Sequence, residues 1–380
     1  MNKIINNLDN QRNVIQVSND FLKKIQIKNK ESAKFYLDFC NNNYNSYNLD
    51  IFDNNYFKSK KIIKKNQLKP NFKNLDEFIK LIEKYEKYEN IEFNGQFEKL
   101  IKIKFQLIKL NNLIGLDNLK NEILDQIIFY VQNIDNLGNF SYLHTVLQGP
   151  PGTGKTEVAK IISEIFANLG MLKSKSFKKV TRADLIAGYL GQTAIKTKKV
   201  IEESLGGVLF IDEAYSLGNS EKRDSFAKEC LDTLCEALSN YKSELMVIIA
   251  GYEDELDRCF FSFNSGLRSR FPWSFNIEKY DYKELFLIFE QKVKEYSWDI
   301  NNDIDNLFFK DNYNLFPAYG RDIENFLNKV KIMYSRRIFI NNLNNNKIII
   351  RLDLENALNL YKKHNSNNDK KDKLPEHMYN

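Results

Sequence analysis

The sequence contains few of the residues that mark disulfide-bonded, zinc-binding or membrane-spanning proteins. It has 4 cysteines, with no CxxC pair, and 3 scattered histidines in 380 residues, which argues against a disulfide framework or a zinc site. No apolar run approaches the roughly 18 residues of a membrane helix, and the polar N-terminus gives no sign of a signal peptide. We therefore expect a soluble, intracellular protein with reduced thiols, in which any metal is a hard cation held by oxygen.

The charge balance gives little support to a nucleic-acid partner. The chain carries 56 Lys and Arg against 50 Asp and Glu, a net charge of +6, which is modest for this length. Hydrophobic residues make up 43% of the sequence, as in globular proteins. Asparagine-rich runs at 41–50 and 341–346 are interpreted as solvent-facing loops. The composition indicates two or three packed units and neither a membrane nor a nucleic-acid partner.

Four regions are predicted along the chain. Residues 1–110 form a helical N-terminal region, in which LDEFIKLIEKYEKY has an apolar stripe at three- and four-residue steps and FEKLIKIKFQLIKL is a second candidate helix. Residues 111–276 alternate short apolar runs with amphipathic stretches, the pattern of a parallel sheet covered on both faces by helices. Residues 277–364 form a small helical unit, with no strand expected after about Phe275, and residues 365–380 form a polar, disordered tail.

The strongest pattern is GPPGTGKT, which starts at Gly149 between an apolar run and an amphipathic helix. It matches the phosphate-binding loop G-x4-G-K-[ST] in the strand–loop–helix setting that this loop requires. The glycines let backbone N–H groups surround the phosphates of ATP at a helix N-terminus. Lys155 would reach the β- and γ-phosphates, and the Thr156 hydroxyl would bind Mg²⁺. The candidate nucleotide-binding residues of the loop are Gly149, Pro150, Pro151, Gly152, Thr153, Gly154, Lys155 and Thr156.

A second apolar run, VLFIDEA at 208–214, ends in adjacent carboxylates. Asp212 is the candidate Mg²⁺ ligand, and Glu213 is the candidate residue for orienting and polarising the attacking water. A strand that ends in Asp-Glu is common in proteins. It becomes specific downstream of a phosphate-binding loop, because hydrolysis needs a carboxylate-bearing strand beside the first.

These motifs resemble those of AAA+ ATPases. The stretches DLIAGYLGQTAIKT, GGVLFIDEAYSL, IIAGYEDEL and GLRSRFPWSFNI are similar to the CbbX/CfxQ group, which includes stage V sporulation protein K. The resemblance covers roughly 113–360 and leaves the first hundred residues outside. It implies an α/β P-loop domain with a parallel sheet flanked by helices and a C-terminal helical lid, to which the pattern of residues 1–110 adds a helical N-terminal extension. It also implies an Mg²⁺-dependent ATP hydrolase that works as a homo-oligomeric ring, a hexamer, on a protein client that the sequence does not identify.

The resemblance assigns further roles residue by residue. Gly115 and Leu116 match a stretch that packs near the adenine. Arg270 matches the arginine finger that enters the neighbouring subunit's ATP site, with Arg268 as a lesser candidate. Arg321, in YGRDIENFL, matches the sensor-2 arginine that contacts the γ-phosphate. For each arginine, an ordinary surface ion pair is the alternative interpretation.

Tyr189, Leu190 and Gly191 resemble the pore loop with which AAA+ rings grip a client. A tyrosine and a leucine between Gly188 and Gly191 would form a mobile, exposed apolar tip. Such a tip is costly unless it binds something. The alternative is a core tyrosine that packs beneath the loop.

The sequence departs from the wider family at three points. The strand that ends IIAGY lacks a polar residue at its end, so no sensor-1 residue is assigned, and Glu324 replaces an arginine that often follows sensor 2. No sugar-phosphate activator site is recognisable, so rubisco activation is not carried over. Two alternative functions stay open at this stage: a DNA-acting AAA+ ATPase, and a nucleotide-switched assembly factor with little turnover.

Overall fold

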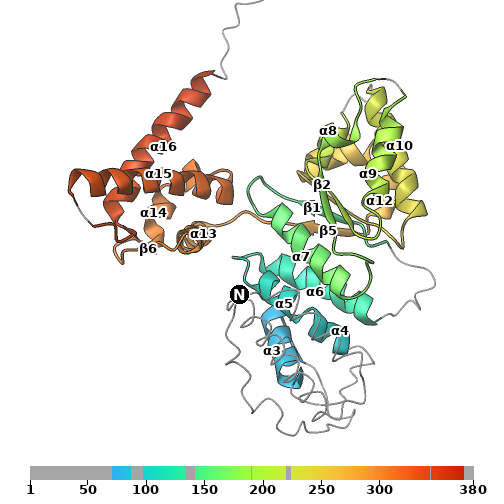
Figure 1. Cartoon of the computed structure of the whole chain (residues 1–380), viewed down its shortest axis with the longest axis horizontal. Coiled ribbons are helices and arrows are strands. Elements are labelled where there is room, and N and C mark those ends of the chain that lie inside the picture. The colour runs from blue at the N-terminus through green and yellow to red at the C-terminus, as the bar shows by residue number, and fades with distance from the viewer. Residues whose placement is uncertain are drawn as a thin grey trace, which may run out of the picture. The chain divides into compact units, whose positions relative to one another are not determined.

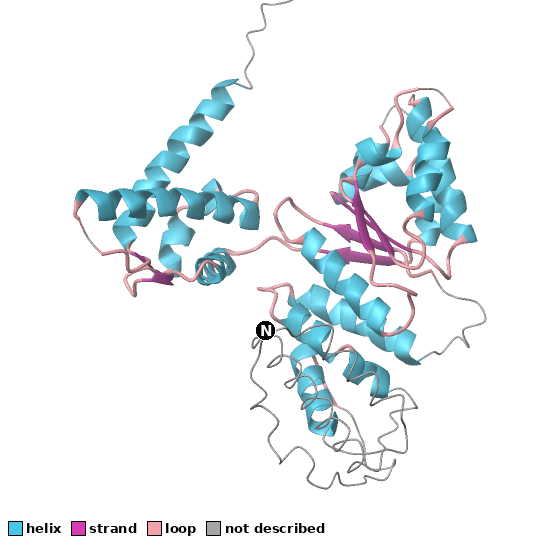
Figure 2. Ribbon diagram, in the orientation of Figure 1, coloured by secondary structure: helices cyan, strands magenta, loops and turns pink. Residues whose placement is uncertain are grey.

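The computed structural model of the chain describes residues 71–86, 97–132, 142–189, 191–219, 224–342 and 344–371. Its central feature is a five-stranded parallel sheet with the strand order β2-β3-β4-β1-β5 (Figures 1 and 2). The strands are β1 (Thr145–Gln148), β2 (Phe177–Val180), β3 (Val208–Ile211), β4 (Met246–Gly251) and β5 (Trp273–Asn276). All pairings are parallel, so the carboxyl ends of the strands lie at one edge, where the phosphate-binding loop follows β1.

The inner strands β1, β3 and β4 are largely apolar because both of their faces are buried. Residues at alternate positions of a strand point to opposite faces. In β3, Phe210 belongs to the core on one face, whereas Leu209 belongs to the core on the other, and neither is exposed to solvent. The apolar runs predicted β1 to β4 correctly, and the predicted sheet between two helical layers is confirmed.

One face of the sheet is covered by α6 (Asp117–Gln132) and α7 (Lys155–Asn168), with α3 (Leu75–Glu86), α4 (Phe97–Lys102) and α5 (Lys104–Asn111) packed beyond them (Figure 1). These helices share one hydrophobic core with the sheet. The second predicted helix of the N-terminal region is interrupted at Ile103, whose backbone is not helical (φ −100°, ψ 1°). Residues 1–70 lie outside the described residues, and the boundary near residue 110 stays a prediction.

The other face is covered by α8 (Arg182–Leu185), α9 (Thr193–Glu202), α10 (Ser225–Asn240) and α12 (Ser265–Arg270). Between the strands and these helices lie three short turns: η4 (Ala214–Leu217), α11 (Glu253–Glu255) and the π-helical η5 (Leu256–Phe261). Turn η4 follows the carboxylates of β3 directly, and α8 and α9 flank the Tyr189 segment. The turn after Glu213, the Tyr189 segment and the arginines of α12 therefore belong to this layer, whereas Lys155 and Thr156 belong to α7 on the opposite face.

The C-terminal unit has a separate core rich in phenylalanine, built from α13 (Tyr282–Glu295), α14 (Asn306–Asp311), η6 (Tyr313–Leu315), α15 (Tyr319–Ile340) and α16 (Arg351–Lys371). The expectation that no strand follows β5 is wrong, because β6 (Asp299–Ile300) and β7 (Ile348–Ile349) form a two-stranded parallel sheet. Helix α16 runs to Lys371, beyond the predicted start of the polar tail at residue 365, and residues 372–380 lie outside the described part. Within the described ranges, no helix combines the length and apolar character needed to cross a bilayer.

Candidate active site

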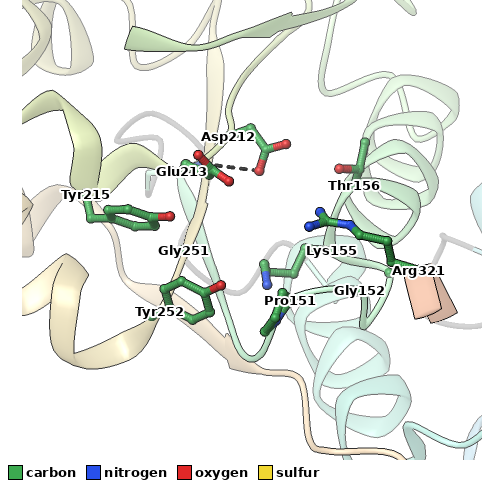
Figure 3. A pocket seen from close by; sticks show the side chains of 11 residues that line it. Pro151, Gly152, Lys155, Thr156, Asp212, Glu213, Tyr215, Gly251, Tyr252 and Arg321 are labelled. Atoms are coloured by element: carbon green, nitrogen blue, oxygen red, sulfur yellow. Dashed lines mark hydrogen bonds between the residues drawn. The ribbon is translucent and has the colours of Figure 1, made fainter. Parts of the chain in front are cut away.

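The glycine-rich loop between β1 and α7 forms one wall of a pocket at the carboxyl edge of the sheet (Figure 3). Gly154 caps α7 with a left-handed backbone (φ 90°), and Gly152 is also left-handed (φ 72°). Such dihedral angles favour glycine, because a Cβ atom would clash with the backbone. From this loop, Pro151, Gly152, Gly154, Lys155 and Thr156 line the pocket.

Lys155 is folded back onto its own loop. Its Nζ donates hydrogen bonds to the carbonyl oxygens of Gly149 at 2.8 Å and Pro150 at 2.6 Å. The pKa of Lys155 is lowered to about 8, mainly by burial and also by the nearby charge of Arg321, against the carboxylates of Asp212 and Glu213, which raise it. A half-buried ammonium with a depressed pKa gains from an incoming anion, since added negative charge restores its preference for the protonated form.

Asp212 and Glu213 extend into the pocket from the end of β3 (Figure 3). The backbone N–H of Glu213 donates to Asp212 Oδ1 at 3.2 Å. Glu213 has a left-handed backbone (φ 52°), which is uncommon for a residue other than glycine and costs of order 1 kcal/mol or more. Residues held in such conformations cluster at functional sites. The left-handed backbone at Glu213 therefore turns the chain away from the direction of β3 at the residue that carries this carboxylate.

The C-terminal unit contributes Arg321, from the first turn of α15, to the same pocket. This unit touches the phosphate-binding loop directly: Gly320 N donates to the carbonyl of Gly152 at 3.0 Å, and the Tyr280 hydroxyl donates to the carbonyl of Thr153 at 3.2 Å. A Cβ atom on Gly152 would lie 1.8 Å from the carbonyl oxygen of Ala318. The close approach of the two units thus requires glycine at position 152.

The other predicted loop residues, Gly149, Pro150 and Thr153, form hydrogen bonds that hold the loop in place. The Thr153 side chain is buried, and its hydroxyl donates to the Pro150 carbonyl at 2.8 Å. Gly149 N donates to the carbonyl of Gly251 at the end of β4. Neither Gly149, Pro150 nor Thr153 lines the pocket, so their position fits a role in shaping the loop.

Gly115 and Leu116 lie at the junction between the two units, outside the residues that line the pocket. Both have left-handed backbones (φ 61° and 62°). Leu116 packs against the core below the sheet and also against the core of the C-terminal unit. A Cβ atom on Gly115 would collide with the carboxylate of Glu284 in α13. The segment before α6 therefore contacts both units, and its role near an adenine stays a prediction.

Four residues of the site were missed by the sequence analysis. Tyr215 and Tyr252 line the pocket opposite the phosphate-binding loop (Figure 3), with their rings stacked at 5.6 Å between centroids. The Nζ of Lys155 lies 5.6 Å from the centroid of the Tyr252 ring. Gly251 also lines the pocket, at the end of β4. Each of these residues follows or ends a strand at the same edge as Asp212, and that position was the available signal.

Lys179 is the fourth missed residue. It extends from β2 and forms an ion pair with Asp212, with Nζ 2.6 Å from Oδ2. The register that aligns β2 with β3 brings the two side chains together. Nothing in the local sequence around FKKV indicated this neighbour.

The two arginines near the end of α12 do not line the pocket of their own chain. Arg270 donates from Nε to Ser239 Oγ at 2.7 Å and from Nη1 to the carbonyl of Gly266 at 2.6 Å. Arg268 is half exposed, pairs with Asp257 and stacks over the Phe261 ring at 4.1 Å. The placement leaves both arginines free of their own nucleotide site, as a residue that acts on a neighbouring subunit must be.

The Tyr189 side chain is 75% exposed, so the alternative of a core tyrosine beneath the loop does not hold. It lies between α8 and α9, and a Cβ atom added to Gly188 or Gly191 would meet no atom within 4 Å. Leu190 lies outside the described residues. The structure thus presents an exposed aromatic tip on an open turn.

Comparison with known proteins identifies several relatives. Residues 145–278 match the family described as ATPase family associated with various cellular activities (AAA). A putative cfxQ-like protein, R730, of Acanthamoeba polyphaga mimivirus is 40% identical over 304 residues, which cover 78% of this chain and 75% of that protein. Stage V sporulation protein K of Bacillus subtilis is 37% identical over 52% of this chain and 62% of its own length. The chloroplastic ribulose bisphosphate carboxylase/oxygenase activase of Cyanidioschyzon merolae is 35% identical over 52% of this chain and 68% of its own length.

Among solved structures, the FIGL-1 AAA domain in complex with ADP is 20% identical, with a TM-score of 0.48. That similarity covers 66% of this chain and 83% of the other.

Proposed function

Because the chain belongs to the CbbX/CfxQ-like group of AAA+ proteins, we propose that it hydrolyses ATP to ADP and phosphate, as a ring of identical subunits, in order to remodel a protein client. The observation that carries the proposal is a single pocket lined by two cationic and two acidic side chains. Lys155 and Arg321 supply positive charge for a triphosphate. Asp212 and Glu213 supply the carboxylates that metal binding and water activation require.

The arrangement supports hydrolysis by a water molecule. Glu213 would accept a hydrogen bond from the water and take its proton as the new bond to the γ-phosphorus forms. The bond between the γ-phosphorus and its bridging oxygen breaks at the same time, and ADP leaves with the electron pair. Lys155 and Arg321 would neutralise charge on the phosphoryl oxygens, which is the main contribution that a protein makes to this reaction.

The oxygen donors of the pocket fit Mg²⁺, which prefers oxygen ligands and keeps several waters. The Thr156 hydroxyl and the Asp212 carboxylate would hold it, and the bound ion would neutralise phosphate charge. Among the described residues, no group of three or more His, Cys, Asp or Glu gathers at one place, so the nucleotide and water would complete the coordination. Lys179 pairs with Asp212 at 2.6 Å and would have to yield part of that contact.

Ring assembly is proposed from the place of Arg270. It does not line its own pocket, and a finger that acts on a neighbour requires a head-to-tail interface, which closes into a ring. Six subunits is the number that the resemblance implies. Arg270 would leave Ser239 or share it when it enters the adjacent site.

A protein client is proposed from the exposed Tyr189 tip. An aromatic side chain that is 75% exposed on an open turn gains free energy when it packs against another chain. Several such tips around a ring would hold an extended chain with little dependence on its sequence. Clients captured on a ring of Glu213→Gln subunits would be identified by mass spectrometry.

Two substitutions test the proposed site. Lys155→Ala should abolish ATP binding, because it removes the charge that meets the phosphates. Glu213→Gln should keep binding but lose turnover by about a hundredfold or more, since it removes only water activation. Phosphate release and fluorescent-nucleotide titration measure the two properties separately. A Glu213→Gln protein that hydrolyses ATP at the normal rate would refute the assignment of the base.

A further inference from the structure

The Tyr189 loop stands on two short helices that are bonded to each other. The Thr197 hydroxyl of α9 donates to the carbonyl of Leu185 in α8 at 3.0 Å, and Ala187 N donates to Thr193 Oγ1 at 3.2 Å. Both threonines are completely buried. Because these bonds lie at the base of the loop, α8 and α9 form one frame, while the tip around Tyr189 is open.

Arg182, at the start of α8, joins this frame to the turn η4, which follows Glu213. Its Nη1 donates to the carbonyl of Ser216 in η4 at 2.6 Å, and its Nη2 donates to Asp224 Oδ2 at 2.6 Å. The planar guanidinium allows both bonds at once, whereas an ammonium is a single point of charge. Arg182 and Asp224 are about one-third and one-fifth exposed (37% and 21%), so water screens the pair only partly.

Ser216 is linked in turn to the residue that faces the attacking water. Ser216 N donates to the carbonyl of Glu213 at 2.8 Å, within the turn η4. Glu213 has the left-handed backbone described above (φ 52°), and relaxation of that backbone would move the carbonyl groups of the turn. The path from Glu213 to the loop frame therefore consists of two hydrogen bonds and one side chain.

The opposite side of the frame is anchored to α10. Asp224 caps that helix, because its Oδ1 accepts from Ala227 N at 3.0 Å. Glu229, in the first half of α10, accepts from Ala194 N at the start of α9 at 3.1 Å. Helix α10 thus holds both Asp224, the partner of Arg182, and the start of α9. This gives Arg182 a fixed support relative to which the turn η4 can move.

We propose that Arg182 is a positioning residue that transmits the state of the nucleotide site to the Tyr189 loop. This inference rests on the proposed function, since it concerns the coupling of ATP turnover to client movement. When the backbone at Glu213 changes between nucleotide states, the Ser216 carbonyl moves, and Arg182 carries that displacement to α8 and the loop. The alternative is that Arg182 only braces the fold, in which case its removal would lower stability and leave the nucleotide response of the loop intact.

Hydrogen exchange of the full chain separates these alternatives without requiring a known client. Exchange across residues 182–197 is measured with saturating ADP and with a slowly hydrolysed ATP analogue, each with Mg²⁺. In the unmodified protein, the exchange rates in this segment should differ by about threefold or more between the two nucleotides, as expected for a local opening equilibrium. In Arg182→Ala that difference should disappear, while the nucleotide dissociation constants change by less than about threefold. Arg182→Lys should restore part of the difference, because one of the two bonds can form.

Arg337→Ala is the matched control. Arg337 also joins a carboxylate and a carbonyl, with Nε to Asp353 Oδ1 at 2.8 Å and Nη2 to Ile348 O at 3.1 Å, but within the C-terminal unit. It should lower thermal stability at least as much as Arg182→Ala and keep the nucleotide-dependent exchange of 182–197.

Three results would overturn the coupling role: an equal nucleotide response in Arg182→Ala and in the unmodified protein, the absence of any response in the unmodified protein, or its loss in Arg337→Ala as well. In each case, intact nucleotide binding would leave the proposed function standing. A chain that binds no nucleotide would refute both proposals. If Arg182→Ala does not fold, Asp224→Asn takes its place, because it keeps the Ser216 bond and weakens only the charged contact. The exchange difference should then fall by about half, and an unchanged difference would contradict the proposal.

Discussion

Raising the pH above 8 should weaken ATP binding through Lys155. In the nucleotide-free protein, burial and the charge of Arg321 lower the pKa of this ammonium to about 8. Bound phosphates stabilise the protonated form and raise the pKa, so binding above pH 8 requires uptake of a proton. The protonated fraction of the free protein falls from about nine-tenths at pH 7 to about one-tenth at pH 9. The apparent dissociation constant for ATP should therefore rise about tenfold over this interval.

Two measurements test this expectation. Titration with a fluorescent ATP analogue from pH 7 to 9 gives the affinity, and calorimetry at pH 8 in two buffers of different ionisation heat gives the proton count. About half a proton should be taken up per nucleotide at pH 8, since the free ammonium is then half protonated. Lys155→Arg is the control, because its guanidinium stays charged throughout. A flat affinity profile without proton uptake in the unmodified protein would show that Lys155 does not meet the phosphates in the way described.

Three further predictions concern the ring, the client and the loop. Homogeneous Arg270→Ala rings should lose about 10³-fold or more in the rate of ATP hydrolysis. Mixing them with Lys155→Ala subunits should recover part of the rate, because a mixed interface pairs an intact phosphate-binding loop with an intact arginine finger. Mixed rings that stay inactive at every ratio would redirect the test to Arg268. Tyr189→Ala should lower basal hydrolysis by less than about threefold but client remodelling by about tenfold or more, with circular dichroism as the check that the variant is folded. Gly152→Ala should lose nucleotide binding at unchanged secondary structure, since a Cβ atom would lie 1.8 Å from a carbonyl of the C-terminal unit at φ 72°; an unchanged dissociation constant would contradict the observed approach of that unit to the loop.

The sequence predicts the three inner strands of the sheet and the edge strand β2, but it misses the edge strand β5 and the short strands β6 and β7. Strand β4 is a continuous apolar run, and every residue of it is buried, so its pattern needs no knowledge of neighbours. Strand β5 is an edge strand with only Phe275 buried, so its apolar content is too low to stand out. Strands β6 and β7 have two residues each, and no periodicity can be read from that length. Strands β5, β6 and β7 were missed because their formation depends on pairing with strands that are distant in the sequence.

The same distinction holds within the active site. Lys155, Thr156 and the glycines between β1 and α7 belong to one continuous stretch of backbone, so a motif can describe their geometry. Lys179 reaches Asp212 only because β2 pairs in register with β3, and a sequence pattern carries no record of that register.

The aromatic pair was missed for a different reason. Tyr215 and Tyr252 stack although 37 positions apart in the sequence (252 minus 215), and an isolated aromatic residue after a strand is most often a packing residue. The IIAGY strand lacks the polar end residue that would orient water, and the structure puts the Tyr252 ring at that place, 5.6 Å from the Lys155 ammonium. A phenol at the end of β4 can contact the loop lysine and still donate a hydrogen bond. The departure from the wider family at this strand is therefore a change in the side chain that borders the proposed phosphate site. The stacking partner Tyr215 lies two residues beyond Glu213, so the Tyr252 ring contacts the turn that carries the proposed catalytic carboxylate.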